Sequence, residues 1–277
     1  MTSQESRRRV QVNTTRTRSR SFERLLVEGM KGTGKSYQWL LLARALQSTG
    51  AIFHVIDCDD AIERMLETEF PDLLEGGNVI VHPVFDWPDY LTARDEITSV
   101  AKPNDWIIGD MIDNAWKAVQ SYFVEQVFKQ DIGDYFLAAR IDLASKGDKT
   151  DRGKTARNLQ PMKGWVDWIV VNRLYDSFML PLLKTRAHLY FTTGVNIVSS
   201  DDDEATRDLY GPFGVTPRGQ KNLPHQVHTE FLFQQDAGKM NSWQISTVKD
   251  RGRKYFDHAP LIDLTTQYFM KVVGWDV

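Results

Sequence analysis

Residues 27–36 read VEGMKGTGKS, and this stretch restricts the possible folds more than any other part of the chain. Four of its residues match the pattern G-x-x-x-x-G-K-[ST], namely Gly29, Gly34, Lys35 and Ser36. An apolar run at 25–27 precedes the loop, and a run without Gly or Pro at 37–46 follows it. The motif needs this order of strand, loop and helix, because loop N–H groups and the helix N-terminus then converge on one anion. The alternative is a glycine turn, capped by Ser36, that binds nothing.

The residue types of this loop assign a role to each position. The backbone cradle for phosphate is predicted to comprise eight residues, which are Gly29, Met30, Lys31, Gly32, Thr33, Gly34, Lys35 and Ser36. Lys35 is expected to reach the β- and γ-phosphates, and the Ser36 hydroxyl to ligate Mg²⁺. The sequence therefore predicts a site for a nucleoside triphosphate, with ATP and Mg²⁺ as the cofactors.

Composition limits the size and the setting of the fold. The chain has 277 residues, 42% of them hydrophobic, and a net charge of −3, which suits one sizeable α/β domain. Its one cysteine, Cys58, is compatible with a reducing compartment. No apolar run has the length of a membrane span, and the N-terminus is too polar for a signal peptide. We therefore expect a cytoplasmic protein without a membrane partner.

The first 21 residues differ in charge from the rest of the chain. Six arginines stand against the single acidic residue Glu5, among Ser, Thr, Gln and Asn. Such a segment buries too little apolar surface to order itself. It is predicted to be a flexible basic arm, which either lies on nucleic-acid phosphates or is a solvated tail. The remaining residues, 22–277, are expected to form the folded domain.

Strand-like apolar runs recur along this domain, with helical segments between the early ones. The runs are residues 51–57, 78–82, 106–110, 188–193, 229–233 and 243–248. The helical segments lie near residues 36–47, 60–69 and 87–101. This alternation predicts an α/β fold with a mostly parallel twisted sheet and helices on both faces. The last two strands are close in sequence and are expected to form an antiparallel C-terminal edge.

Two polar stretches interrupt the pattern and are predicted to be long loops, near residues 130–162 and 195–225. Loops of this length in a compact domain tend to be functional or disordered. The first contains a glycine-spaced basic cluster at 145–157. The second contains the acidic run 201–204 and then Pro217-Arg218-Gly219-Gln220-Lys221.

Acidic residues at strand ends fit the other needs of phosphoryl transfer. A P-loop enzyme needs a carboxylate on a neighbouring strand to orient Mg²⁺. Asp110 closes the run 106–109 and is predicted to fill this role, with Asp113 in reserve; the alternative is an Asp that caps a helix. The run after Ile56 holds three carboxylates that are candidates for positioning the attacking water, which are Asp57, Asp59 and Asp60.

Three segments resemble the RecA/RadA-like ATPases. The strand that ends Ile56-Asp57-Cys58-Asp59, directly after the P-loop helix, is similar to theirs, and the resemblance makes Asp59 the residue that activates water. Thr193 matches the position that senses the γ-phosphate in that family. Lys249-Asp250-Arg251 resembles the K-x-R motif, whose Lys and Arg contact the γ-phosphate bound by a neighbouring subunit. Residues two apart on a strand face one side, so Lys249 and Arg251 are able to point at one anion.

The arrangement over roughly residues 22–260 most resembles the phage-encoded RecA-like ATPases that assist single-strand annealing and recombination. The resemblance implies a RecA-like P-loop fold and a homo-oligomer, ring or filament, with composite active sites. It also implies binding of ssDNA, with a single-strand-binding protein as a candidate partner. Basic residues of the two loops are the predicted phosphate contacts, which are Lys146, Lys149, Arg152, Lys154, Arg157, Arg218 and Lys221.

Other uses of a P-loop remain open on the sequence. A packaging ATPase, a helicase or a helicase loader is also a nucleic-acid motor. A small-molecule or nucleotide kinase would use the carboxylates to bind a substrate hydroxyl, and residues 145–157 as a lid. A nucleotide switch that does not hydrolyse ATP is a further alternative.

Overall fold

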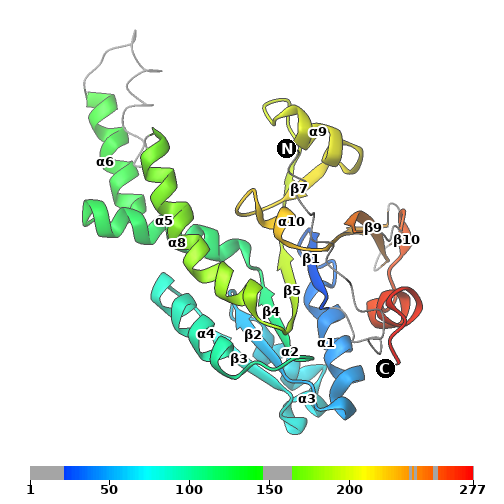
Figure 1. The fold of residues 1–277 in the computed structure, drawn as a ribbon. Coiled ribbons are helices and arrows are strands. Elements are labelled where there is room, and N and C mark those ends of the chain that lie inside the picture. Colours follow the sequence, from blue (N-terminus) through cyan, green and yellow to red (C-terminus); the bar gives the residue numbers. More distant parts are fainter. Residues whose placement is uncertain (1–21, 146–163, 237–238, 240–241, 252–254, 277) are drawn as a thin grey trace, which may run out of the picture.

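The computed structural model describes residues 22–145, 164–236, 239, 242–251 and 255–276 (Figure 1). Its centre is an eight-stranded sheet in the order β10-β9-β8-β1-β5-β4-β2-β3. The strands are β1 (Arg24–Gly29), β2 (Phe53–Asp57), β3 (Val79–Pro83), β4 (Trp106–Asp110), β5 (His188–Thr193), β8 (Thr229–Gln235), β9 (Trp243–Asp250) and β10 (Ala259–Pro260). Neighbouring strands pair in parallel from β8 through β1, β5, β4 and β2 to β3. Strand β9 pairs antiparallel with both β8 and β10. The predicted fold class, a mostly parallel α/β sheet with an antiparallel C-terminal edge, is confirmed.

Helices cover both faces of the sheet. One face carries α1 (Lys35–Leu46), α2 (Ile62–Thr68), α3 (Pro71–Gly76) and the π-helix η3 (Thr265–Val273). The other carries α4 (Trp87–Val100), α5 (Asp113–Phe128) and α8 (Gly164–Lys184). A short 3₁₀ turn, η1 (Gln47–Thr49), extends α1. The central strands are apolar on both sides because both faces are covered.

Two separate cores result from this layering. Alternate residues of β1 face opposite sides: Leu25 and Val27 pack under α1, whereas Leu26 packs under α5 and α8. On the α1 side, Trp106 of β4 is fully buried and its ring stacks on Phe53 at 5.8 Å between centroids. The apolar strand runs of the sequence therefore become the two-sided interior of the sheet.

The segment near residues 130–162 differs from the predicted long loop. Residues 132–145 form a helix, α6 (Ile132–Ser145), and Asp131 Oδ1 accepts hydrogen bonds from the N–H groups of Gly133 and Asp134 at its start. In Figure 1 α6 and the adjoining ends of α5 and α8 extend away from the sheet. The sequence interpretation missed this helix because its apolar residues are not confined to one stripe.

The segment near residues 195–225 is also more regular than predicted. It contains a two-stranded antiparallel sheet, β6 (Val195–Ile197) with β7 (Val215–Pro217), and the elements α9 (Glu204–Tyr210), η2 (Gly211–Phe213) and α10 (Leu223–Gln226). The acidic run serves as a helix start, because Asp203 Oδ1 accepts from Thr206 N at 2.8 Å. A small apolar cluster joins this unit to the main sheet, with Val195 and Tyr210 packed on Leu232 and Val248.

Within these described ranges, no helix has the length and apolar character that crossing a membrane requires.

Candidate active site

The P-loop connects β1 to α1 at the carboxyl end of the parallel strands. Gly34, directly before α1, has φ +83°, a conformation that favours glycine. A Cβ at Gly29 would come within 2.6 Å of the Phe233 carbonyl oxygen of β8, so only glycine fits there. Lys35 is buried, and its Nζ donates to the carbonyls of Gly29 and Met30, both at 3.0 Å. The lysine therefore sits inside the curl of the loop.

Asp110 ends β4 and is hydrogen-bonded to the P-loop helix. Its Oδ2 accepts from the Trp39 indole N–H at 2.9 Å, and its Oδ1 accepts from the Thr192 hydroxyl at 2.5 Å. Burial raises the pKa of Asp110, while the hydrogen bonds from Thr192 and Trp39 and the nearby Ser36 hydroxyl oppose the rise. The predicted pair of magnesium ligands, Ser36 and Asp110, is thus brought together.

The charged groups around Lys35 indicate which part of the pocket suits a γ-phosphate. Burial lowers the pKa of Lys35, whereas Asp110, Asp113 and Asp59 raise it and Arg218 lowers it further. Carboxylates predominate in this set, so a triphosphate alone would meet repulsion there. A divalent cation removes that repulsion, and Ser36 with Asp110 offers the oxygen ligands that Mg²⁺ prefers. Phosphate oxygens and water would complete such a shell when Mg²⁺ is bound.

A pocket of about 940 Å³ adjoins the loop. Residues 29–36 form its floor, and Asp59, Met111, Gly194 and Arg218 lie along it with the other lining groups. An apolar section is lined by Met65, Trp243, Leu261 and Ile262. Gln38 of α1 holds that section in place, because its Oε1 accepts from Leu264 N at 2.7 Å. The lining therefore offers polar groups for phosphates and apolar groups for a flat organic group.

The three carboxylates after β2 have different surroundings. Asp57 is buried and its Oδ2 accepts from Ile62 N at 3.1 Å, so it caps the start of α2. Asp59 and Asp60 are both exposed, and Asp59 lines the pocket. Partial enclosure of the Asp59 carboxyl, then the charges of Asp110 and Asp57, raise its pKa to about 6. Asp59 therefore has the position and the pKa of a group that handles a proton near neutral pH.

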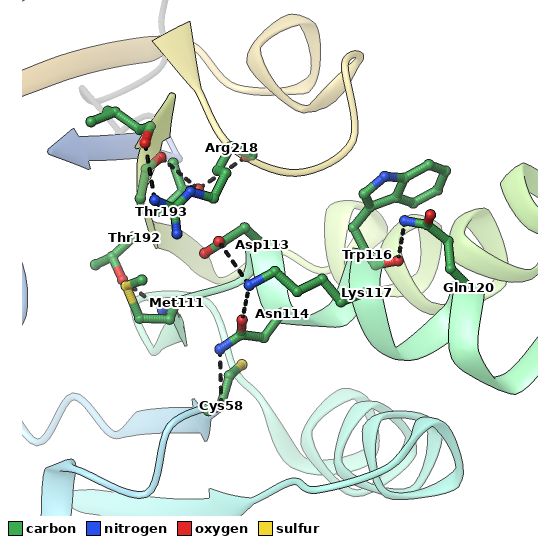
Figure 2. Close-up of polar contacts among 12 residues, drawn as sticks. Cys58, Met111, Asp113, Asn114, Trp116, Lys117, Gln120, Thr192, Thr193 and Arg218 are labelled. Carbon is green, nitrogen blue, oxygen red and sulfur yellow. Dashed lines mark hydrogen bonds and ion pairs between the residues drawn. The ribbon is translucent and has the colours of Figure 1, made fainter. Parts of the chain in front are cut away.

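Thr193, the predicted γ-phosphate sensor, is fully buried. Its hydroxyl donates to the Arg218 carbonyl at 3.0 Å and to the Gly194 carbonyl at 3.2 Å. Figure 2 shows Thr193 beside Arg218, with Asp113 and Met111 close by. Thr193 thus holds the chain that carries Arg218, and its role as a sensor stays a prediction.

The predicted DNA contacts are divided by the structure. Five of them lie outside the described residues, namely Lys146, Lys149, Arg152, Lys154 and Arg157. Lys221 is exposed, and its Nζ lies 3.9 Å from Asp203 Oδ2. Arg218 is exposed and also lines the P-loop pocket, so a ligand in that pocket would lie beside it.

Lys249 and Arg251 lie at the opposite edge of the sheet from the P-loop. Asp250 pairs with Thr229, which pairs with Leu25 at the beginning of β1. Gly29, where the P-loop begins, lies four strand residues beyond Leu25. About 13 Å along the strand therefore separates the level of Asp250 from the P-loop. Lys249 Nζ donates to the carbonyls of Pro224 and, at 3.0 Å, Val227. Arg251 is exposed. Neither cation is near the phosphate end of its own pocket, and their action on a neighbouring subunit stays a prediction.

Two residues of the site were missed in the sequence interpretation, Trp39 and Thr192, which both hydrogen-bond to Asp110. A signal for Trp39 was present, because it follows Lys35 by four residues and so shares its helix face. Thr192 has no such signal, since a threonine near the end of a strand is a common residue for that place.

Comparisons with known proteins add a likeness of fold. No protein-family model matches the chain, and no curated protein sequence matches it. Among solved structures, the chain is similar to the crystal structure of the RadB recombinase, with 12% sequence identity and a TM-score of 0.48. The alignment covers 85% of this chain and 84% of the RadB chain. The roles of the site residues are therefore inferred from the geometry of this chain.

Proposed function

We propose that the protein is a RecA-like P-loop ATPase that binds and hydrolyses ATP with Mg²⁺ and acts on single-stranded DNA. The observation that carries the proposal is the joined P-loop and strand-end carboxylate: Lys35 lies inside the loop, and Asp110 is hydrogen-bonded to Trp39 of the P-loop helix beside Lys35 and Ser36. Such an ATPase would work in recombination or single-strand annealing of phage DNA, or in replication.

The residues of the pocket divide the work of hydrolysis. The loop N–H groups and Lys35 bind the β- and γ-phosphates. Asp59 orients the attacking water and accepts its proton, which its raised pKa permits. Asp110 and Ser36 would hold Mg²⁺, which neutralises charge on the phosphate oxygens when bound. The apolar section around Leu261 and Trp243 suits the base of the nucleotide.

A positive cluster at the far edge of the sheet supports assembly into a composite site. Arg24, Lys249 and Arg251 form this cluster: burial and then Arg251 lower the pKa of Arg24, and burial followed by Arg24 and Arg251 lowers the pKa of the neighbouring His228, which favours its neutral form. Like charges gathered at one edge are stabilised by an anion. A γ-phosphate held by the P-loop of a neighbouring subunit is such an anion, with Arg251 as its exposed contact.

The decisive experiment is the ATPase rate per protomer, measured with and without ssDNA over a series of protein concentrations. We expect ssDNA to raise the rate several-fold, because the basic arm and loop would bind DNA phosphates and salt would weaken the effect. We also expect the rate per protomer to rise with concentration as composite sites form. Hydrolysis in the presence of Mg²⁺ that responds to neither ssDNA nor concentration would contradict the DNA and assembly parts of the proposal.

The same assay separates the alternatives. A kinase would transfer phosphate to an added acceptor and release little inorganic phosphate, so ATP loss without acceptor decides against it. A nucleotide switch would bind ATP without turnover. A translocating motor would displace a bound strand, which an annealing or recombination ATPase need not do.

The raised pKa of Asp59 predicts an acid limb in the pH profile. The active form is the carboxylate, so kcat/KM for ATP is expected to rise with pH through about 6 and then level off. The profile of kcat/KM reports the free enzyme, in which this pKa applies. Asp59→Asn is expected to lower kcat/KM by about 100-fold and to remove this limb. An unchanged limb in the variant would show that another group titrates.

A further inference from the structure

Arg218 is fixed to the end of β5 by its own backbone. Its N–H donates to the Gly194 carbonyl at 2.8 Å, and its carbonyl accepts from the Thr193 hydroxyl at 3.0 Å. These bonds continue the β6–β7 pairing, in which Val195 stands opposite Pro217. The residue after β7 is therefore held at the carboxyl edge of the main sheet, beside the P-loop.

Two glycines make room for this arrangement. A Cβ at Gly194 would lie 3.1 Å from the guanidinium carbon of Arg218, so a side chain there would crowd the cation. Gly219, directly after Arg218, has φ +104°, and a Cβ there would lie 3.2 Å from the Cβ of Asp113. The chain thus turns sharply against α5 immediately after presenting Arg218 to the pocket.

The guanidinium has donors to spare. Its Nη2 donates to the Val195 carbonyl at 3.1 Å, whereas a guanidinium carries five N–H donors. Within the described ranges no carboxylate forms an ion pair with Arg218, in contrast to Arg44, which pairs with Asp72. Arg218 lines the same pocket as Lys35, and its charge acts on Lys35. It is therefore a second cation at the end of the pocket that holds the transferred phosphate.

We propose that Arg218 is a catalytic residue supplied in cis, whose guanidinium binds the γ-phosphate of the nucleotide in the P-loop of its own subunit. This inference rests on the proposed ATPase function. In the step it assists, water oxygen bonds to the γ-phosphorus while the bond from that phosphorus to the β–γ bridging oxygen breaks. ADP and inorganic phosphate leave, and the proton of the water passes to Asp59 and then to solvent. Arg218 stabilises the negative charge on the equatorial oxygens.

The assignment changes what an isolated subunit is able to do. The cations at the far edge of the sheet, Lys249 and Arg251, require a neighbour. Arg218 requires none, because it belongs to the same pocket as Lys35. A single protomer is thus expected to hydrolyse ATP slowly, and assembly to add the contribution of Arg251.

The test compares Arg218→Ala with Arg218→Lys and with Arg207→Ala as the matched control. Arg207 lies on α9 of the same unit, outside the pocket, with its side chain on the Ser200 carbonyl. We expect Arg218→Ala to lower kcat about 100-fold or more, Arg218→Lys to retain part of the rate, and Arg207→Ala to match the wild type. Binding of Mg²⁺ with the β,γ-imido analogue of ATP and with ADP is measured for each. The preference for the triphosphate should fall about tenfold in Arg218→Ala, a change that loss of structure alone would not produce.

Mixing experiments separate action in cis from action in trans. Lys35→Ala mixed with Arg218→Ala is expected to restore no activity, because every pocket then lacks one of the two cations. Lys35→Ala mixed with Arg251→Ala is expected to restore some, because a mixed interface then contains one complete site. Restoration in the first mixture would overturn the cis assignment. So would a wild-type triphosphate preference and kcat in Arg218→Ala. Wild-type protein that binds neither nucleotide would overturn the ATPase function itself, and this inference with it.

Discussion

Lys35→Ala is expected to lower ATP hydrolysis by up to about 1000-fold, to the detection limit of a phosphate-release assay. The Lys35 ammonium lies within the curl of the P-loop, 3.0 Å from the carbonyls of Gly29 and Met30. In that buried position it is the cation expected to meet both the β- and the γ-phosphate. A donor aimed at developing charge in a buried site contributes up to about 4 kcal/mol, which corresponds to the expected loss.

Controls separate this loss from a loss of structure. Lys102→Ala removes an exposed lysine from the loop before β4, at the far edge of the sheet, and is expected to leave the rate unchanged. Lys35→Met keeps the length of the buried stem without its charge, and is expected to behave like Lys35→Ala with a melting temperature near that of the wild type. Retention of full ATPase activity in both Lys35 variants would remove the basis of the proposed function.

The parts of the fold that could be predicted share one physical property. The strands β1, β2, β4 and β5 are apolar over most of their length, because they are buried on both faces, and the P-loop glycines mark where the first one ends. The carboxyl ends of parallel strands meet at one edge, so Asp59 and Asp110 were predictable as neighbours of Lys35. A P-loop needs a carboxylate at such a strand end, and for this reason the proximity of Ser36 and Asp110 was also predictable.

The parts that could not be predicted depend on contacts between distant segments. The strands β6 and β7 have three residues each and no alternation long enough to recognise. Their position follows from Val195 and Tyr210 packing on the main sheet, which no local pattern encodes. The placement of Arg218 in the pocket depends on that same unit, and for this reason the sequence alone favoured a DNA contact. Pro181 lies inside α8, where a proline normally argues for the end of a helix.

Trp106→Ala is expected to lower the free energy of unfolding by about 4 kcal/mol, the largest effect on stability that we predict. Trp106 is fully buried in β4, on the α1 side of the sheet. Its ring stacks on His188 at 4.6 Å and on Phe53 at 5.8 Å, and it meets Phe269 and Trp275 edge-on. The neighbours come from three strands or helices and from the C-terminal segment, so they cannot close together over the cavity left by the indole.

The measurement is thermal unfolding by circular dichroism or calorimetry, with Trp168→Ala as the matched control. Trp168 is 38% exposed on α8 and stacks on Trp116 at 6.0 Å, so its removal opens no enclosed cavity. We expect Trp106→Ala to lower the melting temperature by roughly 10 °C, and Trp168→Ala to cost less than about 2 kcal/mol. Equal losses in the two variants would contradict the packing described here, because the aromatic cluster on Trp106 would then contribute no more than a contact at the surface.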